Sequence, residues 1–129
     1  MTNQHIFITG GASGIGAAAV RLFSSRGWKV TFSDINKEWG NSLSEELGDG
    51  VLFVTADTRN REEIKTAIAA GIEKYGSLCS VFANAGIHRA NTMLDISDEE
   101  LKLMIDTNIY GTVHTLQAAV PNIIESGGG

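Results

Sequence analysis

A glycine-rich segment near the start of the chain constrains the fold more than any other feature. Residues 6–8 are continuously apolar and end at Thr9, a pattern typical of a short buried strand. Residues 9–16 then read TGGASGIG, and from Ile15 apolar residues recur with helical spacing as far as Gly27. A glycine in that place predicts the end of the helix. The sequence therefore predicts a strand, a glycine-rich turn and a helix in immediate succession.

Three glycines of this turn are expected to have different physical roles beside an anion. Gly10 permits a tight turn, Gly14 lets the backbone approach a pyrophosphate, and Gly16 lets the helix pack closely on the sheet. The free N–H groups and the dipole of the helix N-terminus then face the anion. The spacing G-x-x-x-G-x-G differs from the general dinucleotide fingerprint, and no Lys-Ser or Lys-Thr pair follows as in a P-loop. A glycine-rich turn without a ligand is the alternative.

The remainder of the chain alternates strand-like and helix-like stretches. Apolar runs at 29–33, 51–54 and 78–83 predict three more strands. Strands that are apolar throughout are covered on both faces, and helical crossovers imply parallel pairing. We therefore predict an α/β fold, a Rossmann-type doubly wound parallel sheet truncated after about four strands, in three α/β/α layers. The whole of residues 1–129 is expected to form this one domain.

The helices are predicted from apolar periodicity and from their end signals. Ser97 and Glu100 form a capping box ahead of a long helix that runs to about residue 126, with Pro121 expected to kink or break it. Residues with helical spacing define the expected apolar faces of the first three helices: Ile15, Ala18, Ala19, Leu22 and Phe23; Trp39, Leu43 and Leu47; and Ile64, Ile68, Ile72 and Tyr75.

Asp34 supplies a second indication of a nucleotide site. It ends the second predicted strand, about 18 residues after Gly16, where an acidic residue hydrogen-bonds the adenosine ribose hydroxyls. A carboxylate there repels a 2′-phosphate, and the glycine turn contains no Arg or Lys to attract one. The pattern favours NAD over NADP. The alternative is that Asp34 only caps the loop ahead of the second helix.

Composition excludes several other classes of protein. The net charge of −5 argues against a nucleic-acid partner, which needs a basic surface. No window approaches the roughly 18 apolar residues of a membrane span, and residues 1–5 lack the features of a signal peptide. A single cysteine allows no intramolecular disulfide, and the three histidines lack metal-ligand spacing. We expect a cytoplasmic protein without a metal site.

Taken together, these motifs resemble those of the short-chain dehydrogenase/reductase family in its classical form. The resemblance covers essentially the whole chain but only about the first half of a typical member. It implies a dinucleotide cofactor, an alcohol or ketone as substrate, and hydride transfer between them. It also implies an Asp57 contact to the adenine amino group and a cofactor floor shaped by Asn84-Ala85-Gly86, here preceded by Ala83 in place of the usual Asn.

The candidate cofactor-binding residues follow from this resemblance. They lie in the glycine turn and directly after the second, third and fourth strands: Thr9, Gly10, Ser13, Gly14, Ile15, Gly16, Asp34, Ile35, Asp57, Thr58, Asn84, Ala85 and Gly86.

Asn108 is the one candidate catalytic residue. It resembles the family's helix Asn, which holds a water in the proton relay and bends the helix locally. A buried amide with all its hydrogen bonds satisfied is the alternative, since a polar side chain in an apolar helix needs partners.

The rest of the family's catalytic set is absent from the sequence. The family uses a Ser, and a Tyr followed four positions later by Lys; here Tyr75 is followed by Cys79 and Tyr110 by His114. The chain ends in Gly127-Gly128-Gly129, where the family turns toward its fifth strand. We expect a chain that stops before its catalytic half and is inactive alone. The alternative is a non-catalytic dinucleotide-binding or interaction module.

Such a half-fold is expected to associate with itself or with another chain. The fourth strand would form an exposed edge, and the helix face with Val113, Leu116 and Val120 would lack neighbours. A homo-oligomer is therefore predicted.

Overall fold

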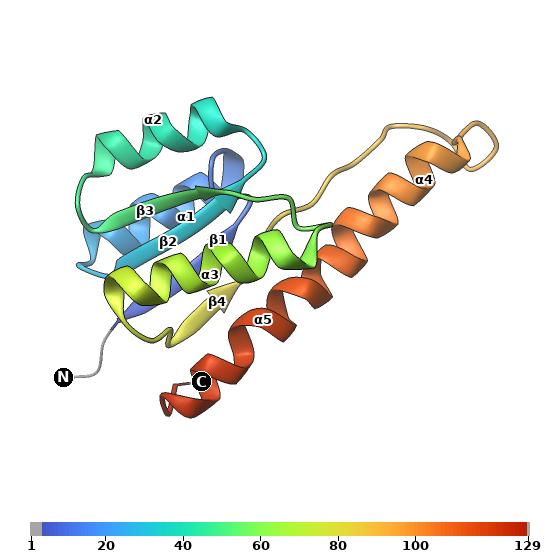
Figure 1. The fold of residues 1–129 in the computed structure, drawn as a ribbon. Helices are drawn as coiled ribbons and strands as arrows, with labels where there is room; N and C mark the ends of the chain where they lie inside the picture. Colours follow the sequence, from blue (N-terminus) through green and yellow to red (C-terminus); the bar gives the residue numbers. More distant parts are fainter. Residues whose placement is uncertain (1–3, 129) are drawn as a thin grey trace.

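A computed structural model describes residues 4–128, so the terminal residues 1–3 and Gly129 named above lie outside its described part. Strands and helices alternate through most of the chain (Figure 1). Their order is β1 (His5–Thr9), α1 (Gly14–Ser25), β2 (Lys29–Asp34), α2 (Lys37–Leu47), β3 (Val51–Thr55), α3 (Arg61–Tyr75), β4 (Ser80–Phe82), α4 (Asp98–Ile105), a π-helical turn η1 (Asp106–Tyr110) and α5 (Gly111–Glu125).

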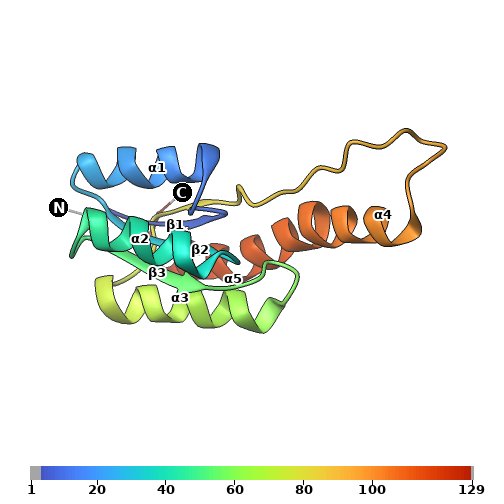
Figure 2. The ribbon, with the colours of Figure 1, turned by 90° about the horizontal axis from the view of Figure 1, so that it is seen from above.

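The four strands form one parallel sheet in the order β3-β2-β1-β4. Helices α1 and α2 cover one face, and α3 and α5 cover the other, so the sheet is the middle of three layers (Figure 2). The predicted fold class and layering are confirmed. β4 pairs only with β1 and forms an edge, as expected, and α4 projects beyond the sheet together with the segment that precedes it.

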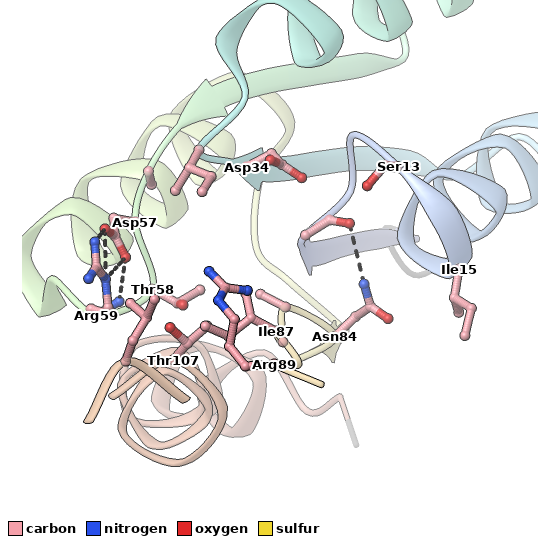
Figure 3. A pocket seen from close by; sticks show the side chains of 16 residues that line it. Ser13, Ile15, Asp34, Asp57, Thr58, Arg59, Asn84, Ile87, Arg89 and Thr107 are labelled. Atoms are coloured by element: carbon pink, nitrogen blue, oxygen red, sulfur yellow. Dashed lines mark hydrogen bonds and ion pairs between the residues drawn. The ribbon is translucent and has the colours of Figure 1, made fainter. Parts of the chain in front are cut away.

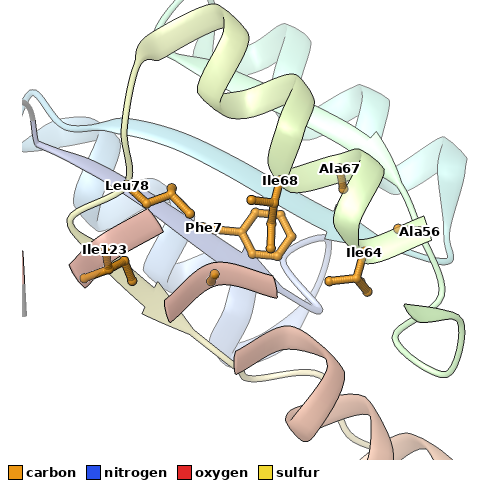
Figure 4. Close-up of a cluster of buried hydrophobic side chains, with 8 residues drawn as sticks. Phe7, Ala56, Ile64, Ala67, Ile68, Leu78 and Ile123 are labelled. Atoms are coloured by element: carbon orange, nitrogen blue, oxygen red, sulfur yellow. The ribbon is translucent and has the colours of Figure 1, made fainter. Parts of the chain in front are cut away.

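Each face of the sheet has its own apolar core, because side chains alternate along a strand. Phe7 of β1 points toward α3 and α5 and is fully buried there (Figure 4). Its neighbours Ile6 and Ile8 point the other way, toward α1 and α2. The cluster around Phe7 contains Ala56, Ile64, Ala67, Ile68, Leu78, Ala119 and Ile123.

Three helices begin at a side-chain cap. Asn36 accepts the N–H of Trp39 at 3.0 Å, Asn60 accepts that of Glu63 at 3.2 Å, and Ser97 accepts that of Glu100 at 3.1 Å. The predicted start at Ser97 is therefore confirmed.

Two predicted helix faces were wrong in part. Ile15 and Leu22 of α1 are exposed, and α1 is buried instead through Gly16 and Val20. Ala17, Ala19 and Phe23 of α1 also pack against this core, so small residues make up much of the inner side of the helix. Trp39 of α2 is likewise exposed, because Gly40 packs against the ring of Phe53.

Two other details also differ from the sequence prediction. The fourth strand is shorter than residues 78–83, because only Ser80–Phe82 pair in the sheet. Pro121 does not end the long helix: α5 continues through it to Glu125. Pro121 and Gln117 are exposed, so water can satisfy the carbonyl that loses its partner. The irregular turn lies earlier, at η1.

Among residues 4–128, no helix combines the length and the apolar character needed to cross a membrane.

A buried histidine links the start of β1 to its neighbours. The Nδ1–H of His5 donates to the carbonyl of Gly76 at 2.8 Å, so Nε2 accepts from the Thr31 hydroxyl at 2.8 Å. The ring also packs edge-on against Tyr75, beside which lie the ammonium groups of Lys29 and Lys74. Burial lowers the pKa of His5, and the Gly76 hydrogen bond opposes that shift more weakly. The folded protein therefore holds this histidine neutral.

This arrangement predicts a loss of stability in mild acid. The unfolded chain binds the His5 proton near the ordinary pKa of 6.5, whereas the folded chain resists it until a lower pH. Stability is therefore full above pH 6.5 and falls below it, with a slope that approaches about 1.4 kcal/mol per pH unit. Urea unfolding from pH 7.5 to 5 measures this slope. His5→Gln should be less stable at neutral pH, but its free energy of unfolding should depend less on pH below pH 6.5. An equal pH dependence of stability in the two proteins would contradict the assignment.

Candidate functional site

The sheet order creates a crevice at the carboxyl ends of its central strands. From β1 the chain moves outward to β2 and β3, then returns to the other side of β1 to form β4. The connections after β1 and β4 therefore leave toward opposite faces of the sheet. Open α/β sheets bind ligands in the crevice between two such connections. A cavity of about 660 Å³ lies at this point (Figure 3). That volume is within the range of small-molecule sites.

Thr9 and Asn84 join the two strands at the crevice. The Thr9 hydroxyl accepts the main-chain N–H groups of Asn84 and Ala85, both at 3.0 Å. In return the Asn84 side-chain amide donates to the carbonyls of Thr9 (3.1 Å) and Gly10 (3.3 Å). These contacts fix the glycine loop against the turn that follows β4.

Gly10, Gly14 and Gly16 of the loop are each required by geometry. Gly10 and Gly14 have φ values of +64° and +55°, which disfavour any residue with a side chain. A Cβ on Gly14 would meet nothing within 4 Å, so its face is open to a ligand. A Cβ on Gly16 would lie 2.0 Å from the Gly10 carbonyl oxygen. Gly16 thus permits the helix to approach the loop and Asn84, rather than the sheet as predicted.

The N-terminus of α1 faces this loop without an internal anion. Ser13 occupies the N-cap position but its side chain makes no capping bond, and the first turn contains no acidic residue. The helix dipole and the unpaired first-turn N–H groups therefore remain available to a bound anion.

Asp34 bridges the glycine loop and the loop after β2. Its Oδ2 accepts the N–H of Ala12 at 3.0 Å and its Oδ1 accepts the N–H of Asn36 at 2.9 Å. The capping alternative considered from sequence is thus part of the structure. An ionised carboxylate has about four acceptor positions, so it can still accept ribose hydroxyls. Ile35 and Ile15 also line the cavity and are 70% and 74% exposed, so a ligand there would cover apolar surface.

Asp57 is paired within the chain, which its sequence position did not suggest. Arg59 donates to its carboxylate through the main-chain N–H, Nε and Nη2, with the shortest distance 2.7 Å (Figure 3). Hydrogen bonding to Arg59 holds the pKa of Asp57 below its ordinary value, and partial burial opposes this shift. The adjacent Thr58 is buried, and its carbonyl accepts the Nδ1–H of His114 at 2.8 Å.

Asn108 lies in the π-helical turn η1 and faces the segment after β4. Its Oδ1 accepts the N–H of Ile87 at 2.8 Å, and its Nδ2 donates to the Ile87 carbonyl at 2.9 Å. Both groups of the amide are therefore engaged, although the residue is exposed and not part of a core. The π-helical turn lies where the family resemblance implied a local bend of the helix.

The cavity gathers most of the candidate residues. Gly14 and Gly16 shape the loop, Thr9 supports it, and Asn108 holds Ile87, as described above. The remaining candidates line the cavity wall: Gly10, Ser13, Ile15, Asp34, Ile35, Asp57, Thr58, Asn84, Ala85 and Gly86.

Sequence reasoning missed part of the lining, namely Ala56, Arg59, Ile87, Arg89, Leu103 and Thr107. Ala56, Arg59 and Ile87 adjoin the strand-end motifs, so their positions next to those motifs could have signalled them. Thr107 precedes Asn108, and Leu103 lies one helical turn earlier. Nothing in the sequence indicated Arg89.

Comparison with known proteins decides the family. The sequence profile of the short chain dehydrogenase family matches residues 4–129. This chain belongs to the short-chain dehydrogenase family.

Its relatives in the family are about twice as long. The chain is 37% identical over 122 residues to short-chain dehydrogenase reductase 3a of Arabidopsis thaliana, covering 93% of this chain and 48% of that protein. It is 38% identical over 108 residues to short chain aldehyde dehydrogenase 1 of Euphorbia lathyris, covering 81% of this chain and 38% of that protein. The chain thus spans about half the length of the curated relatives it matches, or less.

Solved structures of the family superpose on nearly all of this chain. The 3-ketoacyl-(acyl-carrier-protein) reductase of Brucella melitensis, solved with NADH, has a TM-score of 0.93 and 28% identity. It covers 98% of this chain, which in turn covers 52% of that one. The serine dehydrogenase of Escherichia coli has a TM-score of 0.89 and 29% identity, with coverages of 97% and 58%.

The two tyrosines of this chain lie outside the cavity lining. Tyr75 ends α3 beside His5, at the amino-terminal ends of the strands and therefore away from the cavity. Its hydroxyl donates to the Asp49 carbonyl at 2.7 Å. Tyr110 is exposed in η1, with its ring 6.3 Å from that of His114. Within residues 4–128 no three His, Cys, Asp or Glu side chains form a group that could hold a metal ion.

The contact at Gly16 predicts that one added methyl group damages the site. Helix propensity favours Ala over Gly by about 1 kcal/mol, but overpacking costs about 1–3 kcal/mol. A Cβ at 2.0 Å from the Gly10 oxygen forces backbone movement, so the overpacking term should win. Thermal unfolding of Gly16→Ala should show a net loss of stability. Ala18→Ser, on the exposed side of α1, is the matched control; a Gly16→Ala protein more stable than wild type would contradict the packing argument.

Proposed function

We propose that this chain supplies the NAD-binding part of an oxidoreductase that transfers hydride between a nicotinamide and an alcohol or ketone. The observation that carries the proposal is the crevice between β1 and β4. It combines an open glycine loop, an uncapped helix N-terminus and a strand-end carboxylate in one cavity. The glycine loop and the helix N-terminus match the pyrophosphate of a dinucleotide, and the carboxylate matches its adenosine ribose.

The lining residues offer a group for each part of an extended dinucleotide. Asp34 and Ile35 would hold the adenosine ribose, beside Asp57 and Thr58 at the adenine. The open face of Gly14 and the N–H groups of the α1 N-terminus would hold the pyrophosphate. The turn 84–86 and Ile15 would contact the nicotinamide end. The similar reductase of Brucella melitensis was solved with NADH, which supports a dinucleotide as the ligand.

The Asp34 carboxylate supports a preference for NAD. Its oxygens accept hydrogen bonds from the N–H groups of Ala12 and Asn36, so the carboxylate is held in one orientation at the cavity wall. Ribose hydroxyls can donate to it, whereas a 2′-phosphate would be repelled.

The chemistry itself needs groups beyond this pocket. The nicotinamide, when bound, supplies or accepts the hydride. Asn108 is proposed to take part in the proton relay by holding a water, because its amide keeps one N–H and one lone pair beyond the two Ile87 bonds. No Tyr in the sequence is followed four positions later by Lys. We therefore expect these 129 residues to bind NAD without turning over alcohols.

Nucleotide titration tests the binding proposal. The wild-type chain should bind NAD saturably, with a weaker response to NADP, when followed by protein fluorescence or calorimetry. Asp34→Asn should lose NAD affinity by about tenfold and narrow the difference from NADP, because one charge-assisted acceptor is lost. Glu38→Gln, which removes an exposed charge from α2, is the control. Absence of saturable binding, or a wild-type preference for NADP, would contradict the proposal.

We also propose that two copies of the chain associate. The long helical stretch exposes apolar side chains at near-helical spacing: Leu101, Ile105, Ile109, Val113 and Leu116. A single apolar stripe can pair with its own copy about a twofold axis.

Light scattering measures this association directly. The wild-type chain should be dimeric or larger at high concentration. Leu116→Lys together with Val113→Lys should shift it to a monomer, while Lys65→Glu on α3 should not. A monomeric wild-type chain would contradict the proposal.

A further inference from the structure

The two arginines that line the cavity differ in how their charges are compensated. Arg59 forms an ion pair with Asp57, with Nη2 and Oδ2 2.7 Å apart. Arg89 has no carboxylate within ion-pair distance among residues 4–128, and its Nη1 donates to the neighbouring His88 carbonyl at 3.1 Å. A guanidinium has five N–H donors. Arg89 therefore retains both its charge and most of its donors for a ligand.

The side chain of Arg89 points into the cavity. Figure 3 shows its guanidinium between the side chains of Thr58 and Ile87. It reaches the cavity from the segment after β4, whereas the α1 N-terminus reaches it from the glycine loop. The two positive groups thus come from separate walls of the same cavity.

The backbone that carries Arg89 is held on both sides. Two residues before it, the Asn108 amide binds both main-chain groups of Ile87 at 2.8 and 2.9 Å. The Arg89 carbonyl accepts the N–H of Asn91 at 2.9 Å, and the Asn91 side chain is hydrogen-bonded to Glu100 of α4. The guanidinium is therefore carried by an anchored segment, although that segment has no regular secondary structure.

The cavity lining contains two carboxylates and two guanidinium groups, and Arg89 is the one cation of the lining without an ion pair in the described part of the chain. Asp57 and Arg59 compensate each other, and Asp34 is stabilised by two main-chain N–H groups. The dinucleotide brings two negative charges at its pyrophosphate, and the α1 dipole supplies only about half an elementary charge. A planar guanidinium with free donors matches phosphate oxygens in pairs.

From this geometry we propose that Arg89 binds the pyrophosphate of the bound dinucleotide. The inference rests on the proposed function and adds a residue that the glycine loop and Asp34 do not account for. Arg89 is exposed and has no ion-pair partner in the described chain, so its replacement should leave the fold intact.

Calorimetric titration of Arg89→Gln with NAD, NADP and adenosine tests this assignment. NAD and NADP affinity should both fall about ten- to a hundredfold, because charge-assisted hydrogen bonds to the shared pyrophosphate are lost. Adenosine has no phosphate, so its binding should not change. Arg89→Lys should recover part of the loss, since it restores the charge without the planar fork. Arg26→Gln, which removes the same charge at the far end of α1, should bind NAD as the wild type does.

Three results would overturn the assignment. These are unchanged NAD affinity in Arg89→Gln, an effect confined to NADP, which would place Arg89 at the 2′-phosphate, or an equal loss of adenosine binding. The wild-type titration separates this failure from that of the proposed function. If the wild-type chain does not bind NAD, both proposals fail; if it binds and Arg89→Gln binds equally, only the Arg89 proposal fails.

Discussion

The hydrogen bonds between Thr9 and Asn84 hold the rest of the site in place. They connect β1 and β4 at the point where the sheet order reverses, and each bond contributes about 1 kcal/mol net. Four such bonds converge on two residues: two into the Thr9 hydroxyl and two from the Asn84 amide. Without them the glycine loop and the turn after β4 would be separate surface loops. With them the two loops form opposite walls of one cavity.

Close helix packing completes this arrangement on both faces of the sheet. Gly40 of α2 lies against the Phe53 ring, and a Cβ on Gly71 of α3 would meet the Thr31 side chain at 2.4 Å. The same principle operates at Gly111, where α5 approaches Thr58 at the cavity wall. Glycines therefore serve two purposes in this chain. Some adopt positive φ at turns, and others let a helix approach within contact of the sheet or of the cavity loops.

The sequence predicted those parts of the structure that depend on local pattern. Continuous apolar runs identified four strands, and the glycine loop with Asp34 identified the cavity edge, because strand ends in a parallel sheet share one side. The inner face of α1 was predicted incorrectly, because periodicity cannot distinguish a face of large residues from a closely packed face of small ones. Arg89 was missed since the direction of a charged loop residue depends on the path of the whole chain. The contact between Asn108 and Ile87 was not predicted for the same reason, since it joins residues 21 apart in the sequence.

The central claim is that a dinucleotide binds in the crevice at the carboxyl ends of β1 and β4. An ¹⁵N-labelled chain titrated with NAD would test it most directly, with each amide reporting its own surroundings. We expect the largest shift changes along residues 10–16 and 84–89, with Asp34 and Thr58 also affected. Amides near the amino-terminal ends of the strands, such as those of His5 and Tyr75, should hardly change their chemical shifts. Shift changes centred at the amino-terminal ends of the strands or on α4, or no shift changes at all, would show that NAD does not bind in this crevice.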